Sequence, residues 1–202
     1  MADKRLGPPQ TEPAFDIVAI AASAGGVIAL LQIMTELPAE FPAAIVIVQH
    51  LDPRDKSRMP HIFGRRSNLP VEAAVEGMDV KPGHVYLAPP DRHLLINRDG
   101  TVSLTQTELV NFVRPSADLL FESVAAAYGE RAIAVVLAGA GRDGSMGVTA
   151  IKKRGGTVIV QDEASSEFFG MPSAAIRTGA VDFVLSLDEI GPVLVTLVAG
   201  EG

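Results

Sequence analysis

Residues 15–26 read FDIVAIAASAGG, an apolar run that ends in small residues and leads into a helical stretch reaching about Glu36. The run is typical of a strand buried on both faces, and residues 43–50 (AAIVIVQH) and 132–140 (AIAVVLAGA) have the same character. Each run is followed by a loop and a helical stretch. This alternation predicts an α/β fold with a doubly wound, mainly parallel sheet and helices on both faces.

The middle of the chain has a different pattern. Residues 84–90 (HVYLAPP) and 93–106 (HLLINRDGTVSLTQ) indicate extended chain. Asp99 and Gly100 indicate a hairpin turn, because glycine tolerates the positive φ that such a turn needs. We therefore expect an antiparallel hairpin at the edge of the parallel sheet. The remaining elements are expected as a helix near 57–67, a helix over 114–128 capped by Ser116, and strands over 157–162 and 181–186, with residues 187–198 closing the domain.

Length and composition limit the class of protein. The 202 residues suit one well-buried domain, which we place at 15–202 behind a flexible lead at 1–14. A formal charge of −7 and the absence of tryptophan argue against nucleic acid as a partner. The absence of cysteine excludes disulfides and a thiol nucleophile. No apolar window approaches ~18 residues and no signal peptide is visible, so we expect a cytoplasmic protein without membrane insertion.

Three polar residues occupy equivalent places along the chain. Ser23, His50 and Asp143 each lie at or just beyond the carboxyl end of a strongly apolar strand. In an open parallel sheet these ends share one edge, where ligand sites form. A serine nucleophile needs a base, and an imidazole base needs a carboxylate that fixes its tautomer. The three residues are therefore a candidate catalytic triad.

Each of the three also has a purely structural interpretation. Ser23 could cap the following helix, His50 could simply end its strand, and Asp143 could cap the helix that starts near Gly144. The order serine, histidine, aspartate along the chain matches none of the best-known hydrolase folds, although geometry rather than order defines a triad. The joint placement at one edge favours the catalytic interpretation.

Other residues compete for the same roles. His93 follows a loop near the sheet edge and is the rival base, whereas His84 starts a strand and should face the opposite edge. Asp52 and Asp55 are alternative partners for His50. No set of histidines and carboxylates has metal-ligand spacing, so neither a metal nor another cofactor is expected.

A hydrolase also has to stabilise an oxyanion. The backbone amides of Ala24 and Gly25 lie at a helix N-terminus, where N–H groups and the helix dipole favour negative charge. The small residues of 137–144 (LAGAGRDG) allow a second loop to approach, with the amide of Ala140 as a further donor. Glycines in both segments could equally serve tight turns alone.

Six segments of the chain form a recognisable series: IAASAGG (20–26), VIVQHLDP (46–53), PGHVYLAPPDRHLLI (82–96), RPSADLLFESVA (114–125), VVLAGAGRDGSMG (135–147) and QDEASSEFFGMPSAAI (161–176). With these segments in this order, the sequence from about Phe15 to its end resembles the catalytic domain of the protein-glutamate methylesterases of bacterial chemotaxis. The resemblance places the serine, histidine and aspartate of that family on Ser23, His50 and Asp143.

This resemblance implies a serine hydrolase that demethylates γ-glutamyl methyl esters on the cytoplasmic helices of chemoreceptors, releases methanol and can deamidate receptor glutamines. It implies no cofactor. Arg114 and the loop 166–172, with Met171, are expected to border the substrate groove. The alternatives are a salt bridge for Arg114 and core packing for Phe168, Phe169 and Met171. Family members usually have threonine at Ala24, methionine at Ala140 and often histidine at Val113.

The resemblance also leaves questions of regulation and substrate. Family members usually carry an N-terminal receiver domain, and the fourteen lead residues of this chain are too few for one. Two interpretations stay open: the chain is a stand-alone catalytic protein, for which a separate regulatory partner would take the place of the receiver domain, or it is a piece of a larger protein. Two other functions stay open: a methylesterase acting in a non-chemotactic signalling system, and a non-catalytic Rossmann-like module that binds a nucleotide or anion at the SAGG turn. That turn lacks both the G-x-G-x-x-G pattern and a P-loop lysine.

Overall fold

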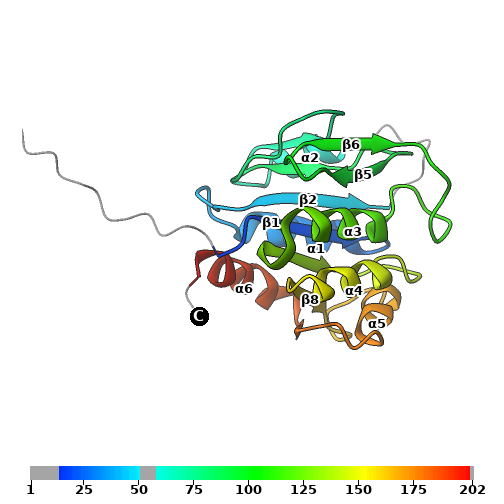
Figure 1. Cartoon of the computed structure of the whole chain (residues 1–202). Helices are drawn as coiled ribbons and strands as arrows, with labels where there is room; N and C mark the ends of the chain where they lie inside the picture. Colours follow the sequence, from blue (N-terminus) through cyan, green and yellow to red (C-terminus); the bar gives the residue numbers. More distant parts are fainter. Residues whose placement is uncertain (1–13, 51–57, 201–202) are drawn as a thin grey trace, which may run out of the picture.

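The computed structural model describes residues 14–50 and 58–200. A seven-stranded sheet forms its centre, with strand order β3-β4-β2-β1-β7-β8-β9 and parallel pairing throughout (Figure 1). This confirms the predicted doubly wound α/β fold. The strands span Ile17–Ala22 (β1), Ala44–Gln49 (β2), Val71–Ala73 (β3), Val85–Leu87 (β4), Ala132–Val136 (β7), Thr157–Gln161 (β8) and Phe183–Leu185 (β9).

The three central strands are buried on both faces. Every side chain of β1, β2 and β7 is buried, as expected for parallel strands covered by helices. Residues alternate between two cores, so that Ile20 of β1 faces one helical layer and Ile17 faces the other. Full burial of each large aliphatic side chain contributes about 1.5–3 kcal/mol to folding. These strands form the rigid platform of the molecule.

Helices cover both faces of the sheet. Apolar residues of α1, α2 and α6 share one core, whereas those of α3, α4 and α5 share the other. Among the described residues, no helix is both long enough and apolar enough to cross a bilayer. The helices span Gly26–Glu36 (α1), Met59–Gly64 (α2), Ala117–Tyr128 (α3), Ser145–Lys153 (α4), Gly170–Ile176 (α5) and Leu187–Ala199 (α6), with a 3₁₀ turn η1 at Gly129–Arg131.

The predicted hairpin exists, but its expected place is wrong. Strands β5 (His93–Ile96) and β6 (Val102–Thr105) pair antiparallel around a turn in which Gly100 has a φ of +80°. They form a separate two-stranded sheet, and β3, which the sequence analysis missed, is the edge strand beside β4. The hairpin buries Leu94, Ile96 and Val102 in the core that includes the apolar residues of α3. In Figure 1 it lies above β2. Apolar burial against a helix, rather than backbone pairing, decided its position.

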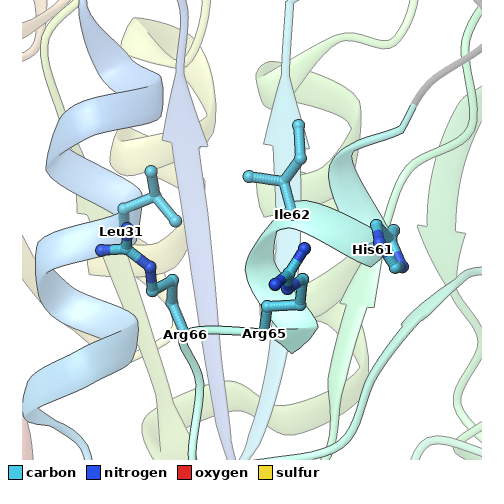
Figure 2. Close-up of a pocket in the computed structure, with 5 residues that line it drawn as sticks. All are labelled: Leu31, His61, Ile62, Arg65 and Arg66. Carbon is cyan, nitrogen blue, oxygen red and sulfur yellow. The ribbon is translucent and has the colours of Figure 1, made fainter.

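A pocket of about 440 Å³ lies between α1 and α2 (Figure 2). Two arginines, Arg65 and Arg66, line it together with His61, Leu31 and Ile62. Figure 2 shows Leu31 on α1, His61 and Ile62 on α2, and the two arginines on the segment that follows the end of α2. None of the three candidate triad residues lines this pocket, so it is a feature separate from the carboxyl edge of the sheet.

Candidate active site

Ser23 and His50 are neighbours at the ends of adjacent strands. Strands β1 and β2 pair in a register that places Ala22 opposite Gln49, so the next residue on each strand lies at the same edge. The His50 amide donates to the carbonyl of Ala22 at 3.0 Å. The Gln49 side-chain amide donates to the carbonyls of both Ser23 (2.9 Å) and His50 (3.0 Å). The backbones that carry the two candidate residues are thus held together.

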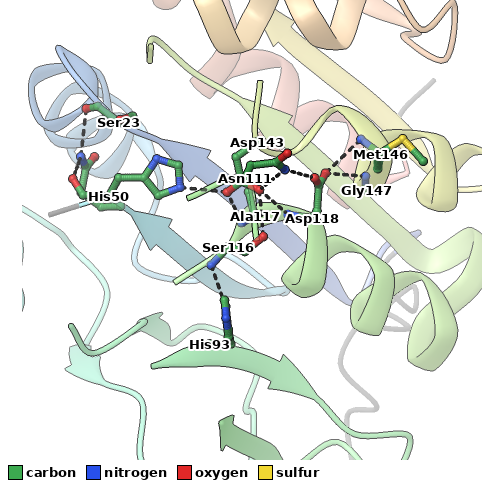
Figure 3. Close-up of polar contacts among 11 residues, drawn as sticks. Ser23, His50, His93, Asn111, Ser116, Ala117, Asp118, Asp143, Met146 and Gly147 are labelled. Atoms are coloured by element: carbon green, nitrogen blue, oxygen red, sulfur yellow. Dashed lines mark hydrogen bonds and ion pairs between the residues drawn. The ribbon is translucent and has the colours of Figure 1, made fainter. Parts of the chain in front are cut away.

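His50 reaches across the end of β1 to the third candidate residue. Its Nε2 lies 2.9 Å from Oδ2 of Asp143, which follows β7 on the other side of β1 (Figure 3). Both side chains are largely buried, with 11% and 3% of their surfaces exposed. Because Nε2 faces the carboxylate, Nδ1 is the ring nitrogen left for a nucleophile. The three strand ends therefore come together as the sequence analysis expected.

Asp143 is bound at the N-terminus of α3. Its Oδ2 accepts the amide of Ala117 at 2.6 Å, and its Oδ1 accepts the hydroxyl of Ser116 at 2.8 Å and the amide of Asp118 at 3.3 Å. Burial alone would raise the pKa of Asp143, but the hydrogen bonds from His50, Ala117 and Ser116 and the attraction to His50 outweigh it and lower that pKa. The carboxylate stays ionised and fixed.

This arrangement corrects two expectations about helix caps. Ser116 is the N-cap residue of α3, as predicted, but its hydroxyl makes no cap hydrogen bond and instead donates to Asp143. Asp143 does not cap the helix that follows it, α4, because its carboxylate is used at α3. Two helix starts that lie far apart in the sequence are thereby joined at the candidate site.

Asp118 performs the reciprocal task and was missed by the sequence analysis. From the first turn of α3, its Oδ1 accepts the amides of Met146 (2.9 Å) and Gly147 (2.8 Å) at the start of α4. Burial is the main cause that raises the pKa of Asp118, and the nearby charge of Asp143 adds to it. An aspartate in a first helical turn is common, so only the tertiary arrangement identifies its partner.

His93 supports the site rather than competing with His50. Its side chain is fully buried, Nδ1 accepts the amide of Ser116 at 3.1 Å, and Nε2 lies 3.0 Å from the carbonyl of Glu108. With one nitrogen accepting and the other donating, the ring is a neutral tautomer with both nitrogens engaged. His93 therefore holds the residue whose hydroxyl binds Asp143.

The turn that carries Ser23 requires glycine. Gly25 has a φ of +77°, and a Cβ built on it would lie 2.9 Å from both Cβ and Oε2 of Glu167. The Ser23 amide donates to the carbonyl of Ala138 at 3.0 Å, and the Ser23 carbonyl accepts the amide of Gly26 at 2.9 Å. In the described part of the chain, the half-buried Ser23 makes no side-chain hydrogen bond. Its hydroxyl is free to react.

The three amides proposed for an oxyanion remain available. Within residues 14–50 and 58–200, the amides of Ala24, Gly25 and Ala140 donate no hydrogen bond. Gly139 brings the Ala140 segment close to Ser23, because a Cβ at Gly139 would lie 2.9 Å from Cβ of Ser23. The two glycine-bearing loops thus approach each other at the serine.

Arg114 and Met171 occupy supporting places. The Arg114 guanidinium binds Oδ1 of Asp91 at 2.6 and 2.9 Å and the carbonyl of Thr107 at 2.6 Å, which is the structural salt bridge considered as an alternative. Met171 is fully buried beneath Gly139, so the expectation that it borders the groove is corrected to core packing. Asp52 and Asp55 lie outside the described residues. Among those described, no three His, Asp or Glu side chains are grouped to hold a metal ion.

Comparison with known proteins agrees with this geometry. Residues 18–194 match the model of the CheB methylesterase family. A protein-glutamate methylesterase/protein-glutamine glutaminase of Moorella thermoacetica is 41% identical over 198 residues, and the chain spans 47% of its length. A putative enzyme of the same name from Leptospira interrogans is also 41% identical, and there the chain spans 95% of the relative.

A solved structure extends the similarity to three dimensions. The catalytic domain of the Thermotoga maritima CheB methylesterase superimposes with a TM-score of 0.88 at 39% identity, covering 91% of this chain and 99% of that domain. The family match covers most of the chain, and Ser23, His50 and Asp143 lie within the matched range. The chain therefore belongs to the CheB methylesterase family.

Proposed function

We propose that this chain is a serine esterase that hydrolyses γ-glutamyl methyl esters on the cytoplasmic helices of chemoreceptors. The observation that carries the proposal is the His50–Asp143 pair at 2.9 Å, formed over the strand end that presents Ser23. The names of the relatives supply the substrate class. Residues 15–202 are the catalytic domain in this proposal, and its place of action is the cytoplasm, where the receptor helices lie.

The reaction begins with a proton transfer to His50. Asp143 accepts the Nε2–H of the ring and leaves Nδ1 as the base. Nδ1 takes the Ser23 proton as Oγ bonds to the ester carbonyl, whose electron pair moves onto oxygen. Amides of Ala24, Gly25 and Ala140 donate to this oxyanion, each contributing about 3–4 kcal/mol in the transition state. No cofactor takes part in this scheme.

The second half of the reaction restores the enzyme. The imidazolium of His50 gives its proton to the departing methoxide, so methanol leaves and the glutamyl group stays bonded to Ser23. A water molecule then loses a proton to Nδ1 and attacks the acyl carbonyl. Collapse returns the proton to Ser23 and releases glutamate. With a glutamine side chain, the same steps release ammonia, in line with the glutaminase name of the relatives.

One contact argues against the alternative of an anion-binding module. The Glu167 carboxylate packs against Gly25 at the start of α1, where a phosphate or nucleotide would have to bind. Like charges at this distance oppose each other. A neutral ester meets no such repulsion when it binds, and the amides of Ala24, Gly25 and Ala140 offset the repulsion of the short-lived oxyanion. The choice of a chemotactic over another signalling substrate rests on the family.

Methanol release tests the proposal. Receptor cytoplasmic fragments carrying labelled methyl esters are incubated with wild type, Ser23→Ala and His50→Ala. We expect each substitution to lower release by at least about 10³-fold. Ser103→Ala is the matched control, because Ser103 lies on β6 and its hydroxyl accepts a hydrogen bond from Asn97 rather than contacting the candidate triad. Unchanged release by Ser23→Ala, or loss in Ser103→Ala alone, contradicts the proposal.

A further inference from the structure

A tight hairpin beside the candidate site holds Phe112 in a backbone conformation that is unfavourable for this residue. Val110 and Val113 exchange backbone hydrogen bonds at 3.2 and 3.0 Å, and the two residues between them have positive φ, +50° for Asn111 and +66° for Phe112. Turns of this type favour Asn-Gly at these positions, because a Cβ is strained at the second. The Phe112 side chain is 94% exposed, so no packing within the described structure compensates for it.

Asn111 fixes this hairpin against the carboxylates of Asp118 and Asp143. Its Nδ2 donates to Asp118 at 2.8 Å and lies 3.5 Å from Oδ1 of Asp143, while its Oδ1 accepts Nε of Arg142 at 3.2 Å (Figure 3). The position of Phe112 relative to the site is therefore set through its immediate neighbour. Folding alone does not account for a phenylalanine at this point of the chain.

Other exposed apolar residues flank the same site. Ile28 lies in the first turn of α1 after Ser23, Met146 in the first turn of α4 after Asp143, and Phe168 in the loop whose carbonyl accepts the amide of Gly139. Leu109, just before the hairpin 110–113, is a fourth such residue. The exposed fractions of the four side chains are 68% for Ile28, 65% for Met146, 44% for Phe168 and 55% for Leu109. Apolar side chains around a polar centre are typical of a surface that binds another protein.

We propose that Phe112, with these four residues, is the docking surface for the protein segment that carries the esterified glutamate. This inference rests on the proposed function. Only two methylene groups separate the ester carbonyl of glutamate from its Cα, so the backbone of the substrate must approach the rim of the site when the ester reaches Ser23. The segment that fits is an amphipathic helix with apolar side chains within a turn of the glutamyl ester. Phe112 determines specificity for protein over free esters.

The test compares two substrates. One is a methyl-labelled receptor cytoplasmic fragment, and the other is the γ-methyl ester of N-acetylglutamate, which is too small to touch the rim. Phe112→Gly removes the side chain while favouring the positive φ of the turn, so the melting temperature should stay equal or rise. We expect kcat/KM for the receptor fragment to fall about tenfold, through KM, with hydrolysis of the small ester unchanged.

Two further variants complete the design. Phe112→Leu keeps an apolar side chain and should retain most of the activity on the receptor fragment. Phe183→Ala is the matched control, since Phe183 is an exposed phenylalanine on the edge strand β9, and it should cleave both substrates as wild type does.

The outcomes separate the two proposals. Wild-type activity of Phe112→Gly on both substrates overturns the docking surface and leaves the esterase proposal standing. Equal loss on both substrates also overturns it, because Phe112 would then act on the triad. Absence of Ser23-dependent cleavage of either substrate by wild type removes the proposed function, and the docking surface with it.

Discussion

The two halves of the candidate site are built differently. Asp143 is almost fully buried and accepts hydrogen bonds from His50, from Ser116 and from two backbone amides of α3. Ser23 is half-buried, and its hydroxyl makes no hydrogen bond in the part of the chain that the structure describes. One half is part of the folding framework, and the other is open to a reactant.

The difference indicates where preorganisation resides. Asp143 binds the N-terminus of α3, and Asp118, in the first turn of α3, binds the N-terminus of α4. The two helices together therefore fix the carboxylate of Asp143, which contacts His50. A nucleophile must instead exchange partners during the reaction, which a dense hydrogen-bond network would prevent. We therefore expect substitutions in the Asp143 half to affect both stability and activity, and a substitution of Ser23 to affect activity alone.

Asp143→Asn should have the largest effect. In asparagine an NH₂ group replaces one of the two carboxylate oxygens, and this group cannot accept the hydrogen bonds that the oxygen now accepts. The side chain then no longer holds His50 in the tautomer that the reaction needs. We expect methanol release to fall by about 10³- to 10⁴-fold and the free energy of unfolding to fall by about 1–3 kcal/mol. Methanol assays and urea unfolding measure the two effects. Asp99→Asn, in the turn between β5 and β6, is the control and should retain activity. An Asp143→Asn variant as stable as wild type would show that the Asp143 half is not part of the folding framework.

Gly139→Ala should have the next largest effect, and it tests the open half. The added methyl group would collide with the buried Met171 sulfur and lie 2.9 Å from Cβ of Ser23, so the serine must shift. We expect about 100-fold lower activity and a loss of about 1–3 kcal/mol in stability. Gly64→Ala is the control, because its Cβ would meet only Cβ of Val71, at 3.9 Å. Wild-type kinetics in Gly139→Ala would show that the position of Ser23 is not constrained by this loop.

Asp118→Asn should have the smallest effect at neutral pH. Oδ1 of asparagine can still accept the amides of Met146 and Gly147, and only the hydrogen bond from Nδ2 of Asn111 is lost, so the free energy of unfolding should fall by about 1 kcal/mol. The informative readout is its dependence on pH, measured by urea unfolding between neutral and acidic pH.

The sign follows from the two pKa shifts. The pKa of Asp143 is lowered, so its contribution to stability is present above the ordinary carboxyl pKa and is lost as the pH falls through the folded value. The pKa of Asp118 is raised, so its ionisation costs stability above the ordinary value, and that cost disappears on acidification. Without Asp118 the loss is no longer offset, and we expect a steeper decline in acid. An unchanged profile would contradict this account.

Much of the platform could be predicted from sequence, because burial on both faces leaves a local signal. The runs at β1, β2 and β7 are continuous and apolar, and their carboxyl ends share one edge in any parallel sheet. That logic was enough to nominate Ser23, His50 and Asp143, and the structure brings these strand ends together. The three-residue strand β3 carries no comparable signal and was missed.

The supporting contacts could not be predicted, since they depend on tertiary placement. Nothing near His93 in the sequence indicates that its ring binds the amide of Ser116, and nothing near Asp118 points to α4. The hairpin 93–105 was placed wrongly because local pattern gives strand pairing but not the surface on which the pair packs. The contacts of His93 and Asp118 and the position of the hairpin all depend on how α3 packs, and local periodicity does not describe that packing.

The central claim is that Ser23 forms a covalent bond with the glutamyl group. Wild-type protein is quenched in acid during turnover of a short methylated receptor peptide, and the digested protein is examined by mass spectrometry. The account predicts that the fragment containing Ser23 gains the mass of the peptide minus methanol, and that Ser23→Ala gives neither this adduct nor methanol release. An adduct on another residue, or wild-type methanol release by Ser23→Ala, would contradict it.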